Sequence, residues 1–220
     1  MEVIRDFIPK GRRNRPGRLM RPEWITVHDT ANPRAGATAL AHAGYLKGAA
    51  ASIPASWHFT VDDRHIVQHL PVDEVAYHAG DGGNGPGNST SIGIEICENG
   101  DGDREAAEAN AVRLIAWLLR RMGLGIERMV PHKKWSGKAC PRLLLPRWEE
   151  FAARVTRALE SELPSPRVGD TPVGRNPSGD DTGGRKVTLD DYLRVVAERD
   201  ILADRLERIR GIAAQATVKE

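Results

Sequence analysis

The sequence predicts an α/β fold, a sheet covered by helices on at least one face, with a helical appendage at the C-terminal end. One observation favours the sheet and two favour the appendage. Strand-like stretches alternate with helix-prone stretches along residues 24–163, the order typical of α/β domains. After residue 163 the composition changes abruptly. The 220 residues, 40% of them hydrophobic and 28% charged, suit one globular domain plus an extension.

Three segments are predicted to form strands. Residues 24–30 (WITVHDT) alternate apolar and polar side chains, which places His28 on the polar face. Residues 57–70 are expected to form a hairpin that turns at residues 62–64. Residues 91–97 (SIGIEIC) carry isoleucines on one face, so Glu95 lies on the other.

Helices are predicted from composition and from capping residues. Residues 37–50 are rich in alanine, and Pro146 is expected to open a helix that runs to about Leu163. The clearest helix spans residues 105–122, with Asp103 as its N-cap and Gly123 as its terminator. Residues 79–91 and 131–142 are expected to be loops.

The chain is expected to divide into three parts. Residues 1–163 form the main domain, including a basic arm at residues 1–21 with seven Lys or Arg against two acidic residues. We interpret this arm as a solvated extension that lies against an anionic partner or surface. Residues 164–187, rich in Pro, Gly, Asp and Arg, are predicted to be a linker. Residues 188–220 contain a helix whose apolar residues follow a 3,4 spacing, which fits either self-association or docking on the domain.

Charge and hydrophobicity argue against nucleic acid as a partner and against a membrane span, and they predict where the protein is made. The net charge of +2 gives no reason to expect nucleic acid, and no stretch has the roughly 20 apolar residues that a membrane span needs. Basic residues near the N-terminus are not followed by an apolar stretch, so we expect no signal peptide and synthesis in the cytoplasm.

Two histidines and a cysteine are candidate metal ligands. His28 ends a strand, and His132 and Cys140 share a loop. Imidazole and thiolate together suit Zn²⁺, and three protein ligands leave a fourth position open, as in catalytic sites. A lone histidine on a strand is more often structural, and His-x7-Cys alone is a weak motif, so these residues are candidates only as a group.

Glu95 and Lys138 are candidate catalytic residues. A carboxylate on the central strand of a covered sheet has little solvent, so it needs a role, and accepting a proton from water is one. Lys138 precedes Cys140 by two positions and would place a cation beside the metal, where it can stabilise an oxyanion. Its alternative is an ordinary surface lysine. Cys97 is interpreted as a small buried residue and not as a fourth ligand.

Four separated blocks, WITVHDTAN, SWHFTVDD, YHAGDGGNGPGNSTSIGIEIC and PHKKWSGKACP, resemble the N-acetylmuramoyl-L-alanine amidase family of phage endolysins and bacillus autolysins. The resemblance covers residues 20–160. It implies a central mixed β-sheet flanked by helices, a surface groove holding one zinc ion, and bacterial peptidoglycan as the substrate.

The resemblance also implies roles for individual residues. His28, His132 and Cys140 match the zinc ligands, Glu95 the catalytic glutamate and Lys138 the lysine that supports the transition state. His78 and Gly80 match the groove wall and are expected to contact the substrate, and His58 to orient or pack beneath the site. Some members of the family have a tyrosine where this sequence has Trp57, so a tyrosine acid or donor is not expected at this position. His42, His65 and His69 are expected on a helix surface or in the hairpin, without a function.

The expected activity is therefore cleavage of the amide between muramic acid and L-alanine, by a phage lysis enzyme that acts on the cell wall after release from the host cytoplasm. Three alternatives stay open: a recognition module that binds peptidoglycan without cutting it, a zinc peptidase that cuts the stem peptide, and an oligomeric scaffold organised by the C-terminal helix. No His-Glu-x-x-His motif supports the peptidase.

Overall fold

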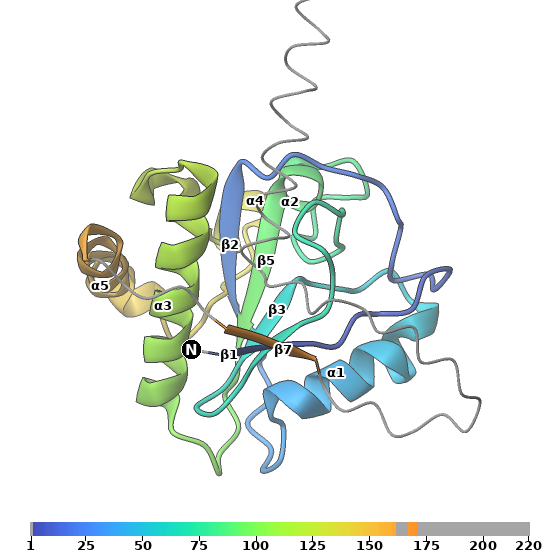
Figure 1. The fold of residues 1–220 in the computed structure, drawn as a ribbon, viewed down its shortest axis with the longest axis horizontal. Coiled ribbons are helices and arrows are strands. Elements are labelled where there is room, and N and C mark those ends of the chain that lie inside the picture. Colours follow the sequence, from blue (N-terminus) through green and yellow to red (C-terminus); the bar gives the residue numbers. More distant parts are fainter. Residues whose placement is uncertain (1, 162–166, 171–220) are drawn as a thin grey trace, which may run out of the picture. The chain divides into compact units, whose positions relative to one another are not determined.

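The computed structural model describes residues 2–161 and 167–170, and they contain a mixed seven-stranded sheet in the order β6-β2-β5-β3-β4-β1-β7 (Figure 1). All neighbouring strands are parallel except the β3–β4 hairpin. The strands are β1 (Glu2–Arg5), β2 (Trp24–Asp29), β3 (Phe59–Val61), β4 (Ile66–Gln68), β5 (Ser91–Ile96), β6 (Met129–Pro131) and β7 (Arg167–Asp170). The predicted strands and hairpin are confirmed.

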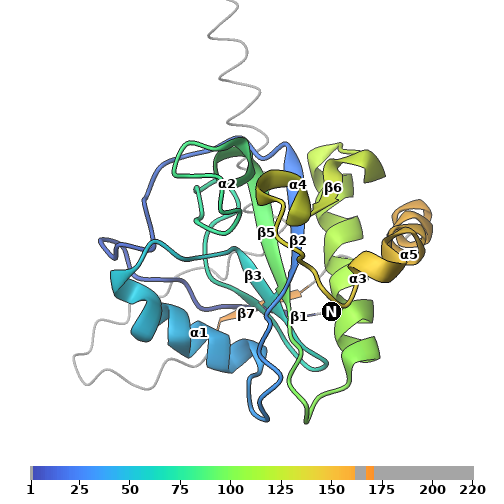
Figure 2. The same cartoon turned by 180° about the vertical axis from the view of Figure 1, so that it is seen from behind.

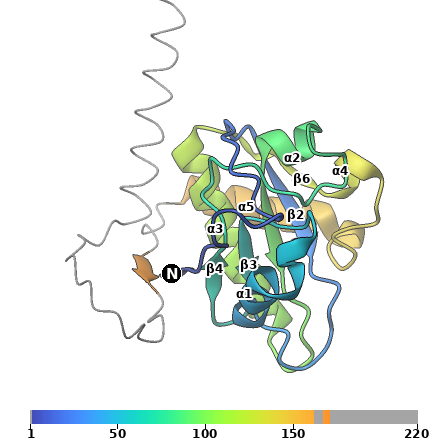
Figure 3. The ribbon, with the colours of Figure 1, turned by 90° about the vertical axis from the view of Figure 1, so that its right-hand side faces the viewer.

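Two helices cover opposite faces of this sheet. Helix α1 (Ala39–Lys47) lies on one face and α3 (Arg104–Met122) on the other, and α5 (Trp148–Glu160) packs on the outer side of α3 (Figures 2 and 3). The predicted caps of α3 are confirmed, since Asp103 accepts a hydrogen bond from the Ala106 amide and Gly123 is left-handed with φ 64°. The mixed sheet flanked by helices is the expected fold class.

The strand alternation separates an apolar layer from a polar one. Ile92, Ile94 and Ile96 of β5 are fully buried, and strand alternation places them on the face opposite to Glu95. The intervening residues of β5 face α1, where Cys97 packs against Ala39 and Ala43. Polar side chains in the middle of the sheet therefore gather on the α1 side.

The basic arm is part of the domain, so its interpretation as a solvated extension is wrong. Residues 2–5 form β1 beside β4, and Ile8 is fully buried. Arg15 is also buried, with hydrogen bonds to both carboxylate oxygens of Glu74 and to the Ile8 carbonyl. Part of the positive charge of the arm is paired outside it, since Arg15 bonds an acid that lies 59 residues away.

Both predicted loops contain a short helix. Within residues 79–91, α2 (Pro86–Thr90) begins at a proline, which is pre-organised for a first helical position. Within residues 131–142, α4 (Lys133–Ser136) ends at Gly137, which has φ 74°. The two helices contact each other, because a Cβ at Gly87 would lie 2.6 Å from the Trp135 ring.

Part of the predicted linker is ordered as a strand, since Arg167–Asp170 form β7 and pair with β1. The remainder of the predicted linker, apart from these four residues, and the predicted C-terminal helix lie outside the described residues. The proposed self-association and the domain boundaries therefore stay predictions. Within the described ranges, no helix combines the length and apolarity needed to cross a membrane.

Candidate metal centre and active site

The site begins with two neighbouring strands. His28 of β2 is paired with Glu95 of β5 in the sheet register, so both side chains emerge on the α1 face. The Nδ1 atom of His28 lies 3.8 Å from Oε1 of Glu95. Gly93, two positions before Glu95, leaves the space that the ring of His78 fills, because a Cβ there would lie 2.7 Å from that ring.

The loop after β6 brings the second half of the site to the first. The His132 amide donates to the Val27 carbonyl at 3.2 Å, which continues the β6–β2 pairing to the site. The Lys133 amide donates to the Cys140 carbonyl at 3.0 Å and closes the loop. Asp29 accepts from the Leu143 amide at 2.8 Å, which fixes the chain just beyond Cys140.

His28, His132 and Cys140 are thereby brought together. They are buried, and their ligand atoms lie within 4.8 Å of one another. The Cys140 Sγ atom is 3.9 Å from His28 Nδ1. The Nδ1 atom of His132 is buried and has no hydrogen-bond partner among the described residues, as expected for an atom that awaits a ligand.

The protonation chemistry of this group fits a divalent cation. Burial, followed by the neighbouring histidines His78 and His132, lowers the pKa of His28 well below 6.5, so its imidazole is neutral, as ligation requires. Burial likewise lowers the pKa of His132. Burial raises the pKa of the Cys140 thiol to about 11, while a backbone hydrogen bond with Asp29 opposes the shift. A bound cation would displace that proton. Two neutral imidazoles and one thiolate form a donor set that zinc prefers.

Glu95 has the environment of a proton-transfer group. Burial, with the charge of Asp29 second, raises the pKa of its carboxyl to about 8, and Lys138 opposes the shift. Its Oε2 atom is buried, and no residue in the described part of the chain forms a hydrogen bond with it. A pKa near the working pH lets one carboxyl both accept and return a proton.

The other predicted residues line one pocket beside the metal group. His132, His78, Gly80 and Lys138 border a cavity of about 810 Å³, together with Asn88 and Ser136. Lys138 is exposed at its rim. Gly80 has φ +70°, which a residue with a Cβ adopts only with strain. The structure therefore places Lys138, His78 and Gly80 beside the metal group, as expected, while their roles stay predictions.

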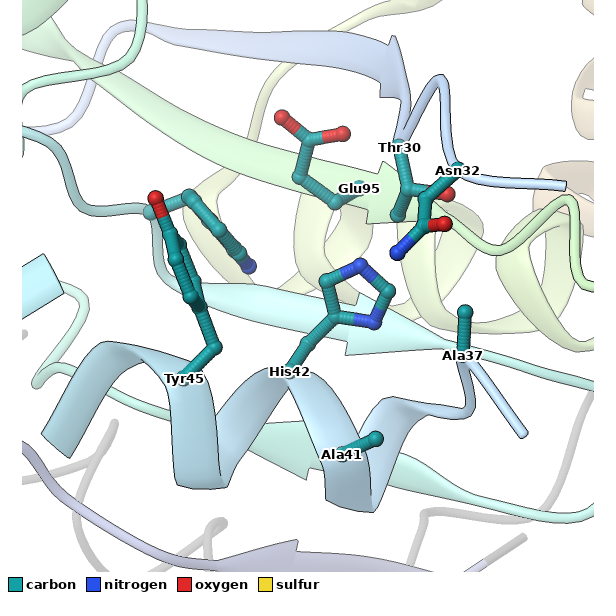
Figure 4. Close-up of a pocket in the computed structure, with 8 residues that line it drawn as sticks. Thr30, Asn32, Ala37, Ala41, His42, Tyr45 and Glu95 are labelled. Carbon is teal, nitrogen blue, oxygen red and sulfur yellow. The ribbon is translucent and has the colours of Figure 1, made fainter. Parts of the chain in front are cut away.

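A second cavity, of about 350 Å³, opens beside Glu95 and was not predicted (Figure 4). Helix α1 contributes His42 and Tyr45, and the loop after β2 contributes Thr30 and Asn32. Trp57 also lines it and stacks on Tyr45 at an interplanar angle of 22°. His42 is 8% exposed, so its expected place on a helix surface is wrong. The sequence contained the information for this placement. His42 lies one helical turn after Thr38, the N-cap residue of α1, and its position in the helix puts it on the same buried side as Ala39 and Leu46.

His58 packs beneath the site, as expected. Its Nδ1 atom accepts from the Gly93 amide at 3.0 Å and its Nε2–H donates to the Glu74 carbonyl at 2.8 Å. Both ring nitrogens are thus used within the fold. Cys97 lies 3.9 Å from the His42 ring and outside the metal group, in agreement with its interpretation as a buried small residue.

Comparisons with known proteins agree with this geometry. The family model described as N-acetylmuramoyl-L-alanine amidase matches residues 18–143. The N-acetylmuramoyl-L-alanine amidase XlyA of Bacillus subtilis is 56% identical over 155 residues, which are 70% of this chain and 51% of XlyA. The chain thus spans about half the length of that relative.

Two solved structures are matched over nearly their whole length. The catalytic domain of XlyA is 55% identical with a TM-score of 0.68, and the match covers 70% of this chain and 99% of that domain. A mutant endolysin from Bacillus subtilis is 56% identical with a TM-score of 0.67, over 70% of this chain and 97% of the endolysin. This chain therefore belongs to the N-acetylmuramoyl-L-alanine amidase family.

Proposed function

We propose that the chain is a zinc-dependent N-acetylmuramoyl-L-alanine amidase that hydrolyses the amide between muramic acid and L-alanine in bacterial peptidoglycan. The observation that carries the proposal is the convergence of His28, His132 and Cys140 within 4.8 Å, beside the half-buried carboxyl of Glu95. Family membership and the match to the catalytic domain of XlyA support it.

Each residue has a defined part in the proposed mechanism. His28, His132 and Cys140 would hold zinc, which polarises a carbonyl group and makes a water molecule a better nucleophile. Glu95 accepts the proton of the attacking water and then delivers it to the departing nitrogen of L-alanine. Lys138, at the rim of the pocket that His132 also lines, stabilises the negative charge that develops on the carbonyl oxygen.

The biological role that we propose is that of a phage lysis enzyme, made in the host cytoplasm and active on the wall after release. The similarity to an endolysin from Bacillus subtilis supports this role. Fractionation of infected or induced cells before and after lysis would test the location. Protein that is found outside the cell long before lysis would contradict it.

The enzymatic proposal is tested by combining metal analysis with product analysis. The purified protein is expected to contain one zinc ion per molecule and to clear a suspension of bacterial walls. Adding a chelator should stop the clearing. Mass spectrometry should then find new L-alanine amino termini. Cleavage inside the stem peptide would favour a peptidase, and binding without cleavage would favour a recognition module.

Glu95→Gln provides the sharpest test of the mechanism. The variant should keep its zinc and lose about 10²- to 10⁴-fold in rate, the usual contribution of a general acid–base group. Glu150→Gln is a matched control, because Glu150 is exposed on α5. Near-full activity in Glu95→Gln would show that another group transfers the proton.

A further inference from the structure

One dipeptide, His78-Ala79, contacts both histidines of the metal group. His28 Nε2 lies 3.0 Å from His78 Nδ1, and His132 Nε2 lies 2.8 Å from the Ala79 carbonyl oxygen. The contacts use the imidazole side chain of the first residue and the backbone of the second. Two ligands that come from separate parts of the sequence therefore share one support.

The hydrogen bonds fix which ring nitrogens carry protons. A carbonyl oxygen only accepts, so His132 Nε2 carries its proton and donates to Ala79, which leaves the lone pair on His132 Nδ1. His78 Nε2 donates to the Ser91 carbonyl at 3.2 Å, so its Nδ1 is the acceptor for His28 Nε2–H. The lone pair of His28 is then also on Nδ1, beside Cys140.

Asn88 holds the dipeptide in place. Its side-chain oxygen accepts from the amide of His78 at 2.7 Å and from the amide of Ala79 at 2.8 Å. Its side-chain nitrogen donates to the Gly82 carbonyl at 2.9 Å. Asn88 is 4% exposed, and its bond to the Ala79 amide is buried. A single amide side chain therefore determines where both supporting groups lie.

We propose that Asn88 and the His78-Ala79 dipeptide are a shared positioning unit that presents the Nδ1 lone pairs of both His28 and His132 to the metal. The inference rests on the proposed zinc site. Groups that accept the second N–H of a ligating histidine orient its ring and raise its basicity. Both nitrogens of His78 are engaged within the fold, which favours this positioning role over a hydrogen bond to the substrate.

The proton arrangement can be tested without any metal. Nitrogen-15 NMR of the histidine rings in the metal-free full chain should find His28, His78 and His132 protonated on Nε2. In His78→Phe, which keeps a ring against Gly93 but has no acceptor, the His28 signal should become a mixture of both neutral tautomers. A predominantly Nδ1-protonated His28 or His132 in the wild type would overturn the inference and leave the proposed activity open.

Metal affinity tests the consequence. In competition with a chelator, Asn88→Ala and His78→Phe are expected to bind zinc about 10- to 100-fold more weakly than the wild type. Asn88→Asp keeps the accepting oxygen and should recover part of that loss. Asn84→Ala is the matched control, since Asn84 is exposed in the same loop and bonds Arg18. The absorption spectrum of the cobalt-substituted protein should change in the first two variants and not in the control.

The outcomes separate the two proposals. If the wild type binds zinc tightly and both Asn88→Ala and His78→Phe match it, the positioning unit is refuted and the zinc site stands. If the wild type does not bind zinc, the proposed function fails, and this inference fails with it. Thermal unfolding of each metal-free variant shows whether it is folded. If Asn88→Ala does not fold, His78→Phe and Asn88→Asp still decide the result.

Discussion

Of the three proposed zinc ligands, Cys140 is the one on which zinc retention should depend most strongly, because it would supply the negative charge. Cys140→Ser replaces a thiolate with a hydroxyl group, which rarely ionises at neutral pH, so we expect zinc to fall well below one equivalent and activity to disappear. Elemental analysis of the purified variant measures this.

Cys97 provides the internal control for that substitution. It is also buried, but it packs against Ala39 and Ala43 of α1 and lies outside the metal group. Cys97→Ser should therefore keep a full equivalent of zinc, whatever it costs in stability. Loss of zinc in Cys97→Ser, or retention in Cys140→Ser, would contradict the assignment of the ligands.

Lys138 is expected to affect the rate of hydrolysis and not the binding of metal. Lys138→Met keeps most of the side-chain length and removes the cation, so kcat should fall about 10-fold or more while zinc content stays at one equivalent. Lys133→Met is the matched control, because it removes the charge of another exposed lysine in the same segment. Equal kinetics for the two variants would return Lys138 to the status of an ordinary surface lysine.

At the level of elements, a buried charge cluster joins α3 to α5. Glu108 of α3 is fully buried and contacts Arg104, Arg147 and Arg154. Burial acts to raise the pKa of this carboxyl, but the hydrogen bonds with Arg147 and Arg104 outweigh it, so the pKa is lowered. Arg104 also contacts Asp29 at 2.5 Å, which connects the cluster to the end of β2 beside His28.

Glu108→Gln should therefore be strongly destabilising. It leaves three arginines without their shared carboxylate, and removing one partner of a buried ion pair costs about 3–5 kcal/mol in the free energy of unfolding. Glu105→Gln, whose side chain is 73% exposed beside Arg154, should cost about 1 kcal/mol or less. Urea unfolding of the metal-free proteins measures both, and similar losses would show that the cluster contributes little.

The elements themselves were predictable where a local pattern determined them. The alternation in β2 and β5 gave the correct face for His28 and Glu95, and Asp103 and Gly123 marked both ends of α3. Three features were missed because they depend on partners far along the chain. Residues 2–5 pair with β4, Arg15 with Glu74, and β7 with β1.

The candidate site divides in the same way. The residue types and the family resemblance indicated the three ligands and Glu95. The sequence did not indicate the cavity beside Glu95, because its lining comes from α1, the end of β2 and Trp57. The sequence also did not indicate Asn88, which acts by accepting hydrogen bonds from two backbone amides. A side chain that acts by positioning backbone groups leaves little trace in a single sequence.

At the scale of the whole molecule, the site exists only in the folded domain. His28 and Cys140 are 112 residues apart and meet through the pairing of β2 with β6 and the loop that follows β6. Zinc that binds the folded domain and not the unfolded chain would stabilise the fold. Metal content and the free energy of unfolding should therefore be coupled. The metal-free protein is the state in which the buried histidines determine how stability depends on pH.

We expect the metal-free domain to lose stability in mild acid. Burial lowers the pKa of His58 to about 4 and that of His69 and His78 to about 3. Below pH 6.5 these histidines bind protons in the unfolded chain but not in the folded chain. The stability that depends on their neutral form is therefore fully present above pH 6.5 and is lost as the pH drops toward 4 and then 3. Each such histidine contributes up to about 1.4 kcal/mol per pH unit within its window.

Glu95 works in the opposite direction but does not cancel this effect. Its carboxyl has a pKa raised to about 8, so the folded state takes up a proton there and gains stability as the pH falls from 8 toward 4.5. One carboxyl opposes these three histidines and His28, whose pKa is also lowered well below 6.5, so the melting temperature of the metal-free chain should decrease between pH 6.5 and 4.5. His58→Gln, although less stable at pH 7.5, should show a shallower decrease, because one proton-binding site is gone from the unfolded chain. A melting temperature that stays constant over this interval would mean that the histidines are not buried as neutral groups.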